Sequence, residues 1–328
     1  MLREYLSWSS ACGLVAVLAA CSNAGGDLGP GPTTTNAVTV NLFLDRDGSL
    51  TYTPLDTVFA GARVALLISG SSDTLKAVTS NSVGTARFDK VPLGQYRVTV
   101  VPASIGDSIE VQQIIDSANI RVRAVDTNTV VLIRLGYPEV SIREARALPA
   151  GKRVFIRGKV LGGALFRDST THVADTSGQI RLTRVSLRGG LTTTNPGDSV
   201  SVIGETSSRA GQPTLDEAAI SKLSTRPPPQ ALAISSGTAA NANIGLLDAA
   251  LVQVTSVLIS DTSTVAPDFR VVASDGSGDL TIILDGNLNF VRSNFRPGRS
   301  IIVKGLLVPD GQGGWVLKPR DLGDVTLL

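Results

Sequence analysis

The stretch PGDSVSVIGETSSRAGQPTLDEAAISKL (196–223) occurs in this chain in two related forms. Its counterpart is PGRSIIVKGLLVPDGQGGWVLKPRDLGDV (297–325). Both begin with Pro-Gly, continue with an apolar strand and a glycine, and enter a hairpin that turns at Gly-Gln or Gln-Gly. An internal repeat of this kind indicates one structural unit that has been copied. The sequence therefore predicts two related domains in the second half of the chain.

Two further pairs of segments occur in the same order in both copies. Each copy holds about five short strands rich in Val, Ile, Leu and Thr, separated by turn residues, which is typical of small all-β domains. We expect the copies to span 137–225 and 237–328, with the proline-rich stretch 226–236 as a stiff linker. The further pairs are GKRVFIRGKVLGG (151–163) with LDAALVQVTSVLIS (247–260), and DTSGQIRLT (175–183) with SDGSGDLTIIL (274–284).

Each copy begins with a short segment followed by a strand that reads V-x-V/I-x-G-x-V, as in SIREARALPAGKRVFIRGKV (141–160). This arrangement resembles the OB-fold domains of bacterial exported proteins, including those appended to extracellular nucleases. The resemblance implies two small five-stranded barrels, each with one face that binds oligonucleotides or oligosaccharides. The fold by itself selects neither ligand.

The first domain is expected over residues 37–136, where apolar alternation predicts several strands. In TSNSVGTARFDKVPLGQYRVTVVP (79–102), Gly84 lies in a hairpin, Phe88 and Val91 point inward, and a Pro-Leu-Gly turn precedes Tyr96. The pattern resembles the carboxypeptidase regulatory-like and B-type surface-adhesin repeat. This resemblance implies a transthyretin-like or immunoglobulin-like β-sandwich of the kind that serves as a stalk or spacer. The whole chain is thus predicted to be all-β.

The loop DRDGSLTYTPLD (45–56) has the spacing of a calcium loop. Such loops place oxygen ligands at positions 1, 3, 5, 7, 9 and 12. The sixth position is Leu50 rather than glycine. The register also fits adhesin-type repeats that carry a calcium loop between their first two strands; the alternative is a polar loop in which the aspartates form turns. The candidate ligands are Asp45, Asp47, Ser49, Thr51, Thr53 and Asp56.

The N-terminal segment indicates an exported protein. A short apolar run ends at VLAAC, followed by a polar Ser, Asn, Gly, Pro and Thr stretch. Leu18-Ala19-Ala20-Cys21 resembles the lipobox of bacterial lipoproteins, which implies a signal peptide over 1–20, acylation of Cys21 and a flexible tether over 21–36. The expected location is the cell envelope, at the outer membrane where the bacterium has one. The alternative is an ordinary signal peptide with an incidental cysteine.

The sequence gives no sign of catalysis. His172 is the only histidine, and there is neither a G-x-S-x-G nor an S-x-x-K motif. A zinc site needs several His or Cys ligands, and a phosphate-binding glycine loop is absent. With 30 basic and 28 acidic residues, the overall charge does not favour a nucleic-acid partner either. We therefore expect a protein that is not an enzyme.

Basic residues concentrate in the first barrel copy. On the strand 153–160, the two-residue period places Phe155, Arg157 and Lys159 on one face, and Arg181 faces the same way on another strand. We predict that these residues line one exposed, anion-binding sheet face; the alternative is an ordinary solvated surface. In the second copy, Trp315 either stacks on a sugar or base, or plugs the barrel.

These features predict a non-catalytic, lipid-anchored envelope protein that acts as a binding or scaffold module. The ligand to expect on the basic face is an anionic polysaccharide or a nucleic acid. Two alternatives remain open. One is a purely structural stalk that contacts other envelope proteins through exposed strand edges. The other is an accessory subunit of an exported nuclease.

Overall fold

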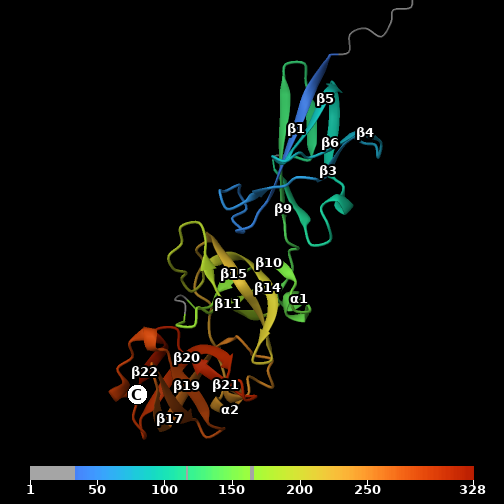
Figure 1. The fold of residues 1–328 in the computed structure, drawn as a ribbon. Helices are drawn as coiled ribbons and strands as arrows, with labels where there is room; N and C mark the ends of the chain where they lie inside the picture. Colours follow the sequence, from blue (N-terminus) through green and yellow to red (C-terminus); the bar gives the residue numbers. More distant parts are fainter. Residues whose placement is uncertain (1–33, 116, 163–165) are drawn as a thin grey trace, which may run out of the picture.

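The computed structural model describes residues 34–115, 117–162 and 166–328. It consists of a β-sandwich and two β-barrels that follow one another along a line, with the sandwich at one end and the C-terminal barrel at the other (Figure 1). The predicted all-β fold is confirmed. In the described part of the chain, no helix is long and apolar enough to cross a membrane.

The sandwich is built from two sheets. The strand β1 (Thr35–Leu44) is the centre of the first sheet, because it pairs in parallel with β9 (Asn128–Gly136) and antiparallel with β5 (Thr85–Pro92). That sheet also contains β2 (Thr57–Val58) and β7 (Glu110–Ile115). The second sheet has the order β4 (Thr74–Thr79), β3 (Arg63–Ile68), β6 (Gly94–Val100), β8 (Asn119–Val122), and a 3-10 turn, η1 (Pro102–Ser104), follows β6.

The predicted inward residues of the sandwich fill its core. Phe88 and Val91 are buried between the sheets. The Tyr96 hydroxyl donates to the Pro92 carbonyl at 2.9 Å and so closes the tight turn between β5 and β6. Gly84 has a φ of +73°, and a Cβ there would lie 2.5 Å from the Leu42 carbonyl oxygen. The hairpin therefore needs glycine at this position.

The first barrel, called barrel 1 below, begins with the short helix α1 (Ile142–Ala147). Its sheet runs β12–β11–β10–β14–β15, and a parallel pairing of β12 with β15 closes it into a barrel. Alternate side chains such as Val154 and Ile156 point into the barrel and form its core. The strands are β10 (Arg153–Val160), β11 (Thr171–Ala174), β12 (Gln179–Leu182), β14 (Ser199–Arg209) and β15 (Gln212–Ser224), with β13 (Ser186–Leu187) beside β15.

The second barrel, barrel 2, repeats this topology. Its strands pair in the order β17–β18–β19–β21–β20, β19 and β21 are parallel, and β17 pairs with β20 to close the barrel. The elements are α2 (Ser236–Ala240), β17 (Leu251–Val265), β18 (Asp268–Ser274), β19 (Leu280–Leu284), η2 (Gly286–Leu288), η3 (Arg292–Asn294), β20 (Ser300–Pro309), β21 (Trp315–Lys318), η4 (Leu322–Asp324) and β22 (Val325–Leu327).

The proline-rich stretch between the barrels is more ordered than a free linker. A Cβ on Gly197 of barrel 1 would lie 2.5 Å from the Arg226 carbonyl oxygen and 2.6 Å from that of Pro227. The prolines thus pass directly over a turn of barrel 1. The stretch then forms β16 (Leu232–Ala233), which pairs in parallel with β17.

The same capping device fixes the helix of each barrel. In barrel 1, the Asp175 carboxylate accepts the Ile142 amide and the Ser177 hydroxyl accepts the Arg143 amide. In barrel 2, Asp275 accepts the Ser236 amide at 2.9 Å, and Ser277 accepts the next amide of the helix. Because a helix leaves its first amides unpaired, these hairpin side chains attach each helix to its barrel.

Replacing Asp275 by alanine is expected to lower the free energy of unfolding by about 1–2 kcal/mol, as for other lost helix caps. Hydrogen bonds from Ser277 and Ser236 hold the pKa of the Asp275 carboxyl well below its usual value. Its stabilising contribution is therefore present above about pH 4 and is lost as the pH falls further. Urea unfolding at pH 7 and pH 3 measures both effects.

The matched control is Asp279→Ala, because Asp279 is exposed in the same hairpin. An equal loss of stability in both variants would contradict the capping role of Asp275.

Candidate functional site

The loop 45–56 follows β1 at the end of the sandwich that faces barrel 1. Its three aspartates, Asp45, Asp47 and Asp56, each present a carboxylate oxygen within 4.8 Å of the others. Asp45 and Asp47 are each 2% exposed. The structure thus brings together the carboxylates that the calcium-loop spacing predicted as ligands 1, 3 and 12.

Hydrogen bonds within the loop already engage these side chains. The Asp45 carboxylate accepts the amides of Gly48 and Leu50, and the Asp47 carboxylate accepts the Ser49 amide and the Thr53 hydroxyl. The other predicted ligands bond to each other, since the Ser49 hydroxyl donates to the Thr51 carbonyl. The aspartates therefore form turns within the loop, which was the alternative to an ion site. This holds whether or not the loop also binds an ion.

A buried arginine on β9 faces the acidic cluster. Arg134 is 4% exposed, and its Nη1 lies 3.0 Å from Asp45 Oδ2. Burial raises the pKa of Asp45 despite this ion pair. Burial also acts to raise the pKa of Asp47, but hydrogen bonds from Ser49 and Thr53 outweigh it, and the net shift is downward. Sequence reasoning missed Arg134, because it lies in a strand that otherwise reads as apolar core.

The backbone of the same loop binds barrel 1. The Ser221 hydroxyl on β15 donates to the Asp47 carbonyl at 2.6 Å, and the Ser201 hydroxyl on β14 donates to the Gly48 carbonyl. A Cβ added to Gly48, which has a φ of +69°, would lie 3.6 Å from the ring of Phe155. The loop therefore lies on the outer face of β10, β14 and β15. This contact is the first junction between folded units.

The predicted basic face is not one exposed surface. Phe155 is 3% exposed beneath the loop, and Arg181 is 5% exposed at the contact with barrel 2. Arg157 is exposed, stacks over the Phe155 ring at 5.4 Å and pairs with Glu139 at 2.9 Å, while Lys159 is exposed. The two-residue strand period correctly predicted that these side chains point out of the barrel. It could not show that Arg181 lies on β12, beyond β11, at the end of barrel 1 that meets barrel 2.

The second junction joins the two barrels. Leu161 and Phe166, from the segment after β10, form one apolar cluster with Leu251 on β17 and Leu306 on β20. The Lys318 ammonium lies 4.3 Å from the centre of the Phe166 ring and 3.3 Å from Asp285.

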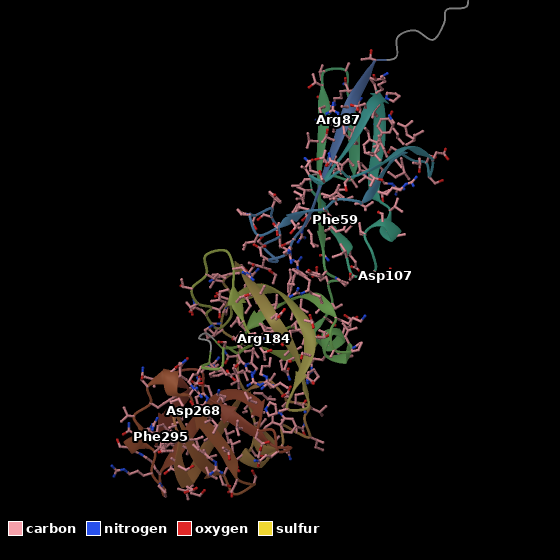
Figure 2. The ribbon with its side chains drawn as sticks, in the orientation of Figure 1. Phe59, Arg87, Asp107, Arg184, Asp268 and Phe295 are labelled. Carbon is pink, nitrogen blue, oxygen red and sulfur yellow. The ribbon has the colours of Figure 1, made fainter. Side chains whose placement is uncertain are left out.

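Polar contacts surround this apolar cluster. The Arg320 guanidinium donates to the Leu161 carbonyl at 2.7 Å, and Arg146 pairs with Asp248 at 3.1 Å. Figure 2 labels Asp268 on the side of barrel 2 that faces barrel 1, and Arg167 approaches it at 3.6 Å. The junction is thus closed by apolar packing at its centre and by charged pairs at its edge.

The contact with barrel 2 also reaches β12 of barrel 1. The Gln179 amide donates to the Asp248 carbonyl at 3.2 Å across the junction. On the barrel 2 side, Trp315 packs against the barrel core and its Nε1 donates to the Asp248 carboxylate at 3.0 Å. This is the plug arrangement rather than an exposed stacking platform.

His172 on β11 is completely buried, and among the described residues neither ring nitrogen has a hydrogen-bond partner. Burial, aided by the nearby charges of Arg181 and Lys318, lowers its pKa to about 3. Its ring meets Phe166 edge to face at 6.2 Å between centres. The side chain therefore behaves as an apolar member of the second junction. The lipidation candidate Cys21 lies outside the described residues.

No protein-family model matches the chain, and no curated protein matches it. Among solved structures, the protein ygiW from E. coli matches 27% of this chain and 98% of its own length, with 22% identity and a TM-score of 0.23. The Ifi202 HINa domain, solved in complex with 20bp dsDNA, matches 55% of this chain and 97% of its own, with 14% identity and a TM-score of 0.28.

Asparaginyl-tRNA synthetase from Pyrococcus horikoshii matches 25% of this chain at 17% identity and a TM-score of 0.22. The match takes in 20% of the synthetase. At these scores the architecture rests on the strand pairing described above, and no activity is transferred.

His172 is expected to remain neutral in the folded protein from pH 8 down to about pH 4. Because it is the only histidine, its ring carbon signals can be followed by NMR without ambiguity. The unfolded chain takes up the proton near pH 6.5, so stability should fall by up to about 1.4 kcal/mol per pH unit below that point.

A His172→Phe variant should lose this part of the pH dependence. A native-state titration of His172 with a midpoint near pH 6.5 would show that the ring is solvated and that the second junction opens in solution.

Proposed function

We propose that this protein is a non-catalytic scaffold of the bacterial cell envelope, and that it holds its C-terminal barrel at a fixed distance and orientation from the sandwich, which a flexible tether connects to a membrane anchor. The observation that carries this proposal is that both junctions between folded units are packed with buried side chains. A chain of independent domains would instead show few contacts across exposed linkers.

The first junction supports a rigid connection because it uses backbone as well as side chains. Ser201 and Ser221 bond to two successive carbonyls of the sandwich loop, next to the buried ring of Phe155. Two bonds at adjacent residues fix both the position and the rotation of the loop. The second junction adds an apolar cluster of four buried side chains.

The same burial favours a scaffold over a polymer-binding face on barrel 1. An anionic polysaccharide or nucleic acid would need Phe155 and Arg181 to be accessible, but both are buried, and the Arg181 guanidinium donates to the Arg209 carbonyl. Arg157 is already paired with Glu139. An accessory role beside an exported nuclease would need a comparable free surface on barrel 1.

The anchor in this proposal is a lipid on Cys21, and the partner that it implies is the membrane. The lipobox-like LAAC and the polar tether that follows it support this part. Membrane fractionation of cells that produce Cys21→Ser tests it, since the variant should leave the membrane fraction.

The scaffold itself is tested by a distance distribution between its ends. Spin labels at Ser72→Cys in the sandwich and Thr326→Cys in barrel 2, in a chain whose Cys12 and Cys21 are serine, should give one narrow peak by pulsed EPR. Phe166→Ala should broaden the peak, because it removes the aromatic side chain from the second junction. Arg320→Ala, which removes the bond to Leu161, should act in the same direction.

The control is Leu322→Ala, which shortens an apolar side chain that is 57% exposed away from the cluster. It should leave the peak unchanged. A broad distribution in the parent chain would contradict the scaffold.

We further propose that a calcium ion stabilises the first junction. Asp45, Asp47 and Asp56 fit a divalent cation in the spacing of their oxygens, and bound calcium would offset the repulsion between the buried carboxylates. Arg134 already neutralises part of this charge, which points to weak binding.

If this is correct, millimolar calcium should raise the unfolding midpoint of the full chain. The free energy of unfolding would rise by about 2.7 kcal/mol at a hundredfold excess of calcium over the dissociation constant. Asp56→Asn should abolish the rise, whereas Asp73→Asn, at an exposed position of the same domain, should retain it. No rise with 10 mM calcium, about ten times the dissociation constant of the weakest extracellular sites, would leave the loop with only its turn-forming role.

A further inference from the structure

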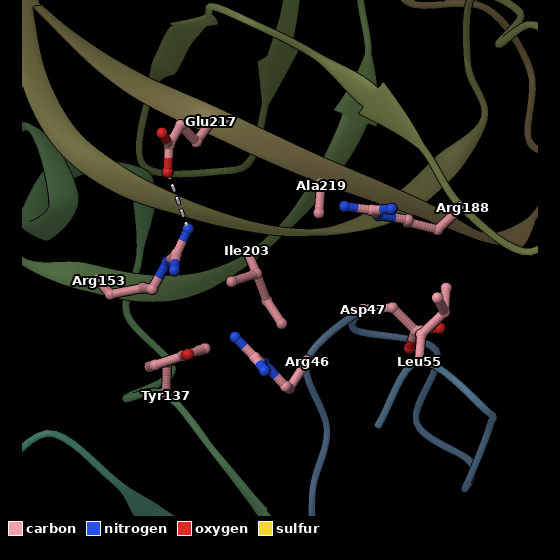
Figure 3. A pocket seen from close by; sticks show the side chains of 9 residues that line it. All are labelled: Arg46, Asp47, Leu55, Tyr137, Arg153, Arg188, Ile203, Glu217 and Ala219. Carbon is pink, nitrogen blue, oxygen red and sulfur yellow. Dashed lines mark hydrogen bonds and ion pairs between the residues drawn. The ribbon is translucent and has the colours of Figure 1, made fainter. Parts of the chain in front are cut away.

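A second feature of the first junction is a cavity beside the loop. It measures about 200 Å³ and lies between the sandwich loop and barrel 1 (Figure 3). Arg46, Arg153 and Arg188 line it, together with Tyr137, Ile203 and two carboxylates, Asp47 and Glu217. The cavity is smaller than a typical pocket for a drug-sized ligand, so it suits a single small group.

The three arginines come from distant parts of the chain. Arg46 follows β1 in the sandwich loop, Arg153 is the first residue of β10, and Arg188 follows β13. Figure 3 shows the side chains of Arg46 and Arg188 reaching from different sides toward the space around Ile203 and Ala219, while Arg153 reaches toward Glu217. Docking of the loop on barrel 1 is what places Arg46 beside the other two.

The charges of this cavity are not balanced among the described residues. Glu217 pairs with Arg153 at 3.4 Å and with Arg184 at 3.6 Å. The Asp47 carboxylate is held by Ser49 and Thr53 in its own loop. Neither Arg46 nor Arg188 has a carboxylate partner in the part of the chain that the structure describes.

Hydrogen bonds are also missing. The Nε atoms of Arg153 and Arg188 are buried, and within the described ranges neither has an acceptor. A buried donor without an acceptor is costly, and more so when it is charged. The two carboxylates of the cavity therefore leave part of the guanidinium charge and these Nε donors without a partner among the described residues, and an oxyanion supplies both charge and acceptors.

We propose that this cavity binds a phosphate-type oxyanion. Guanidinium groups donate paired hydrogen bonds to phosphate. A tetrahedral anion can accept such bonds from several directions, as arginines on different sides of the cavity require, whereas a carboxylate offers two oxygens in one plane. Tyr137 and Ile203 also line the cavity. This inference goes beyond the scaffold role and does not depend on a lipid anchor or on calcium.

The test is calorimetric titration of the full chain with inorganic phosphate at constant ionic strength. Arg188→Gln and Arg46→Gln should each weaken binding about tenfold or more, because each removes charged hydrogen bonds. Arg188→Lys should bind between the parent and the glutamine variant. The matched control is Arg226→Gln, an exposed arginine away from the cavity, which should bind like the parent.

Three further titrants distinguish between the possible chemical forms of the ligand. Methyl phosphate that binds like inorganic phosphate would indicate a terminal phosphomonoester or the free ion, whereas preferential binding of dimethyl phosphate would indicate a phosphodiester of an envelope polymer. Acetate should bind at least tenfold more weakly than phosphate. Equal binding of acetate, or an equal loss in Arg188→Gln and Arg226→Gln, would overturn the proposal, as would the absence of any phosphate binding at millimolar concentration.

Discussion

The placement of the three folded units relative to one another depends on one kind of surface in each barrel. It is the outward face of β10 and β14 in barrel 1, and of β17 and β20 in barrel 2. In barrel 1 this face carries Phe155 and Ser201 and receives the loop of the sandwich. In barrel 2 the equivalent face carries Leu251 and Leu306 and receives Leu161 and Phe166 of barrel 1. Each unit thus places a loop on the same type of strand face in the next unit. Because these faces are curved and their side chains interlock, the contact restricts rotation as well as separation.

The two contacts are built with different chemistry. The first is largely polar, since backbone carbonyls meet serine hydroxyls next to a cluster of aspartates and arginines. The second is apolar at its centre and carries Lys318 and Asp285 at its edge. Polar contacts have stricter geometry but exchange with water more readily. The first junction thus rests mainly on hydrogen bonds and ion pairs, and the second mainly on apolar packing.

Much of the fold was predictable from local pattern, and so was the clustering of Asp45, Asp47 and Asp56, whereas the contacts between the folded units were not. Tyr96 acts on Pro92, four residues away, and the hairpin at Gly84 could be inferred from the local pattern. The Asp-x-Ser-Gly hairpins were visible as a repeat, but they cap helices that lie 33 and 39 residues away, so their capping role could not be inferred. The direction of Phe155 and Arg181 followed from the strand period, but the period says nothing about what covers an outward side chain. The period likewise could not identify Arg134 as the partner of Asp45, 89 residues away along the chain. Contacts between domains depend on the packing of whole units, and this leaves little trace in a single sequence.

The parallel pairing of β1 with β9 has a mechanical consequence. The chain enters the sandwich at the start of β1 and leaves toward barrel 1 at the end of β9, at the opposite end of the domain (Figure 1). The two strands lie side by side in register from Ala37 with Asn128 to Leu44 with Leu135. A force that pulls the two ends of the chain apart therefore acts along the strands, in shear, and loads all the hydrogen bonds of this pair together. A hairpin pulled from one end would break its bonds one at a time, so this connectivity resists tension applied along the chain.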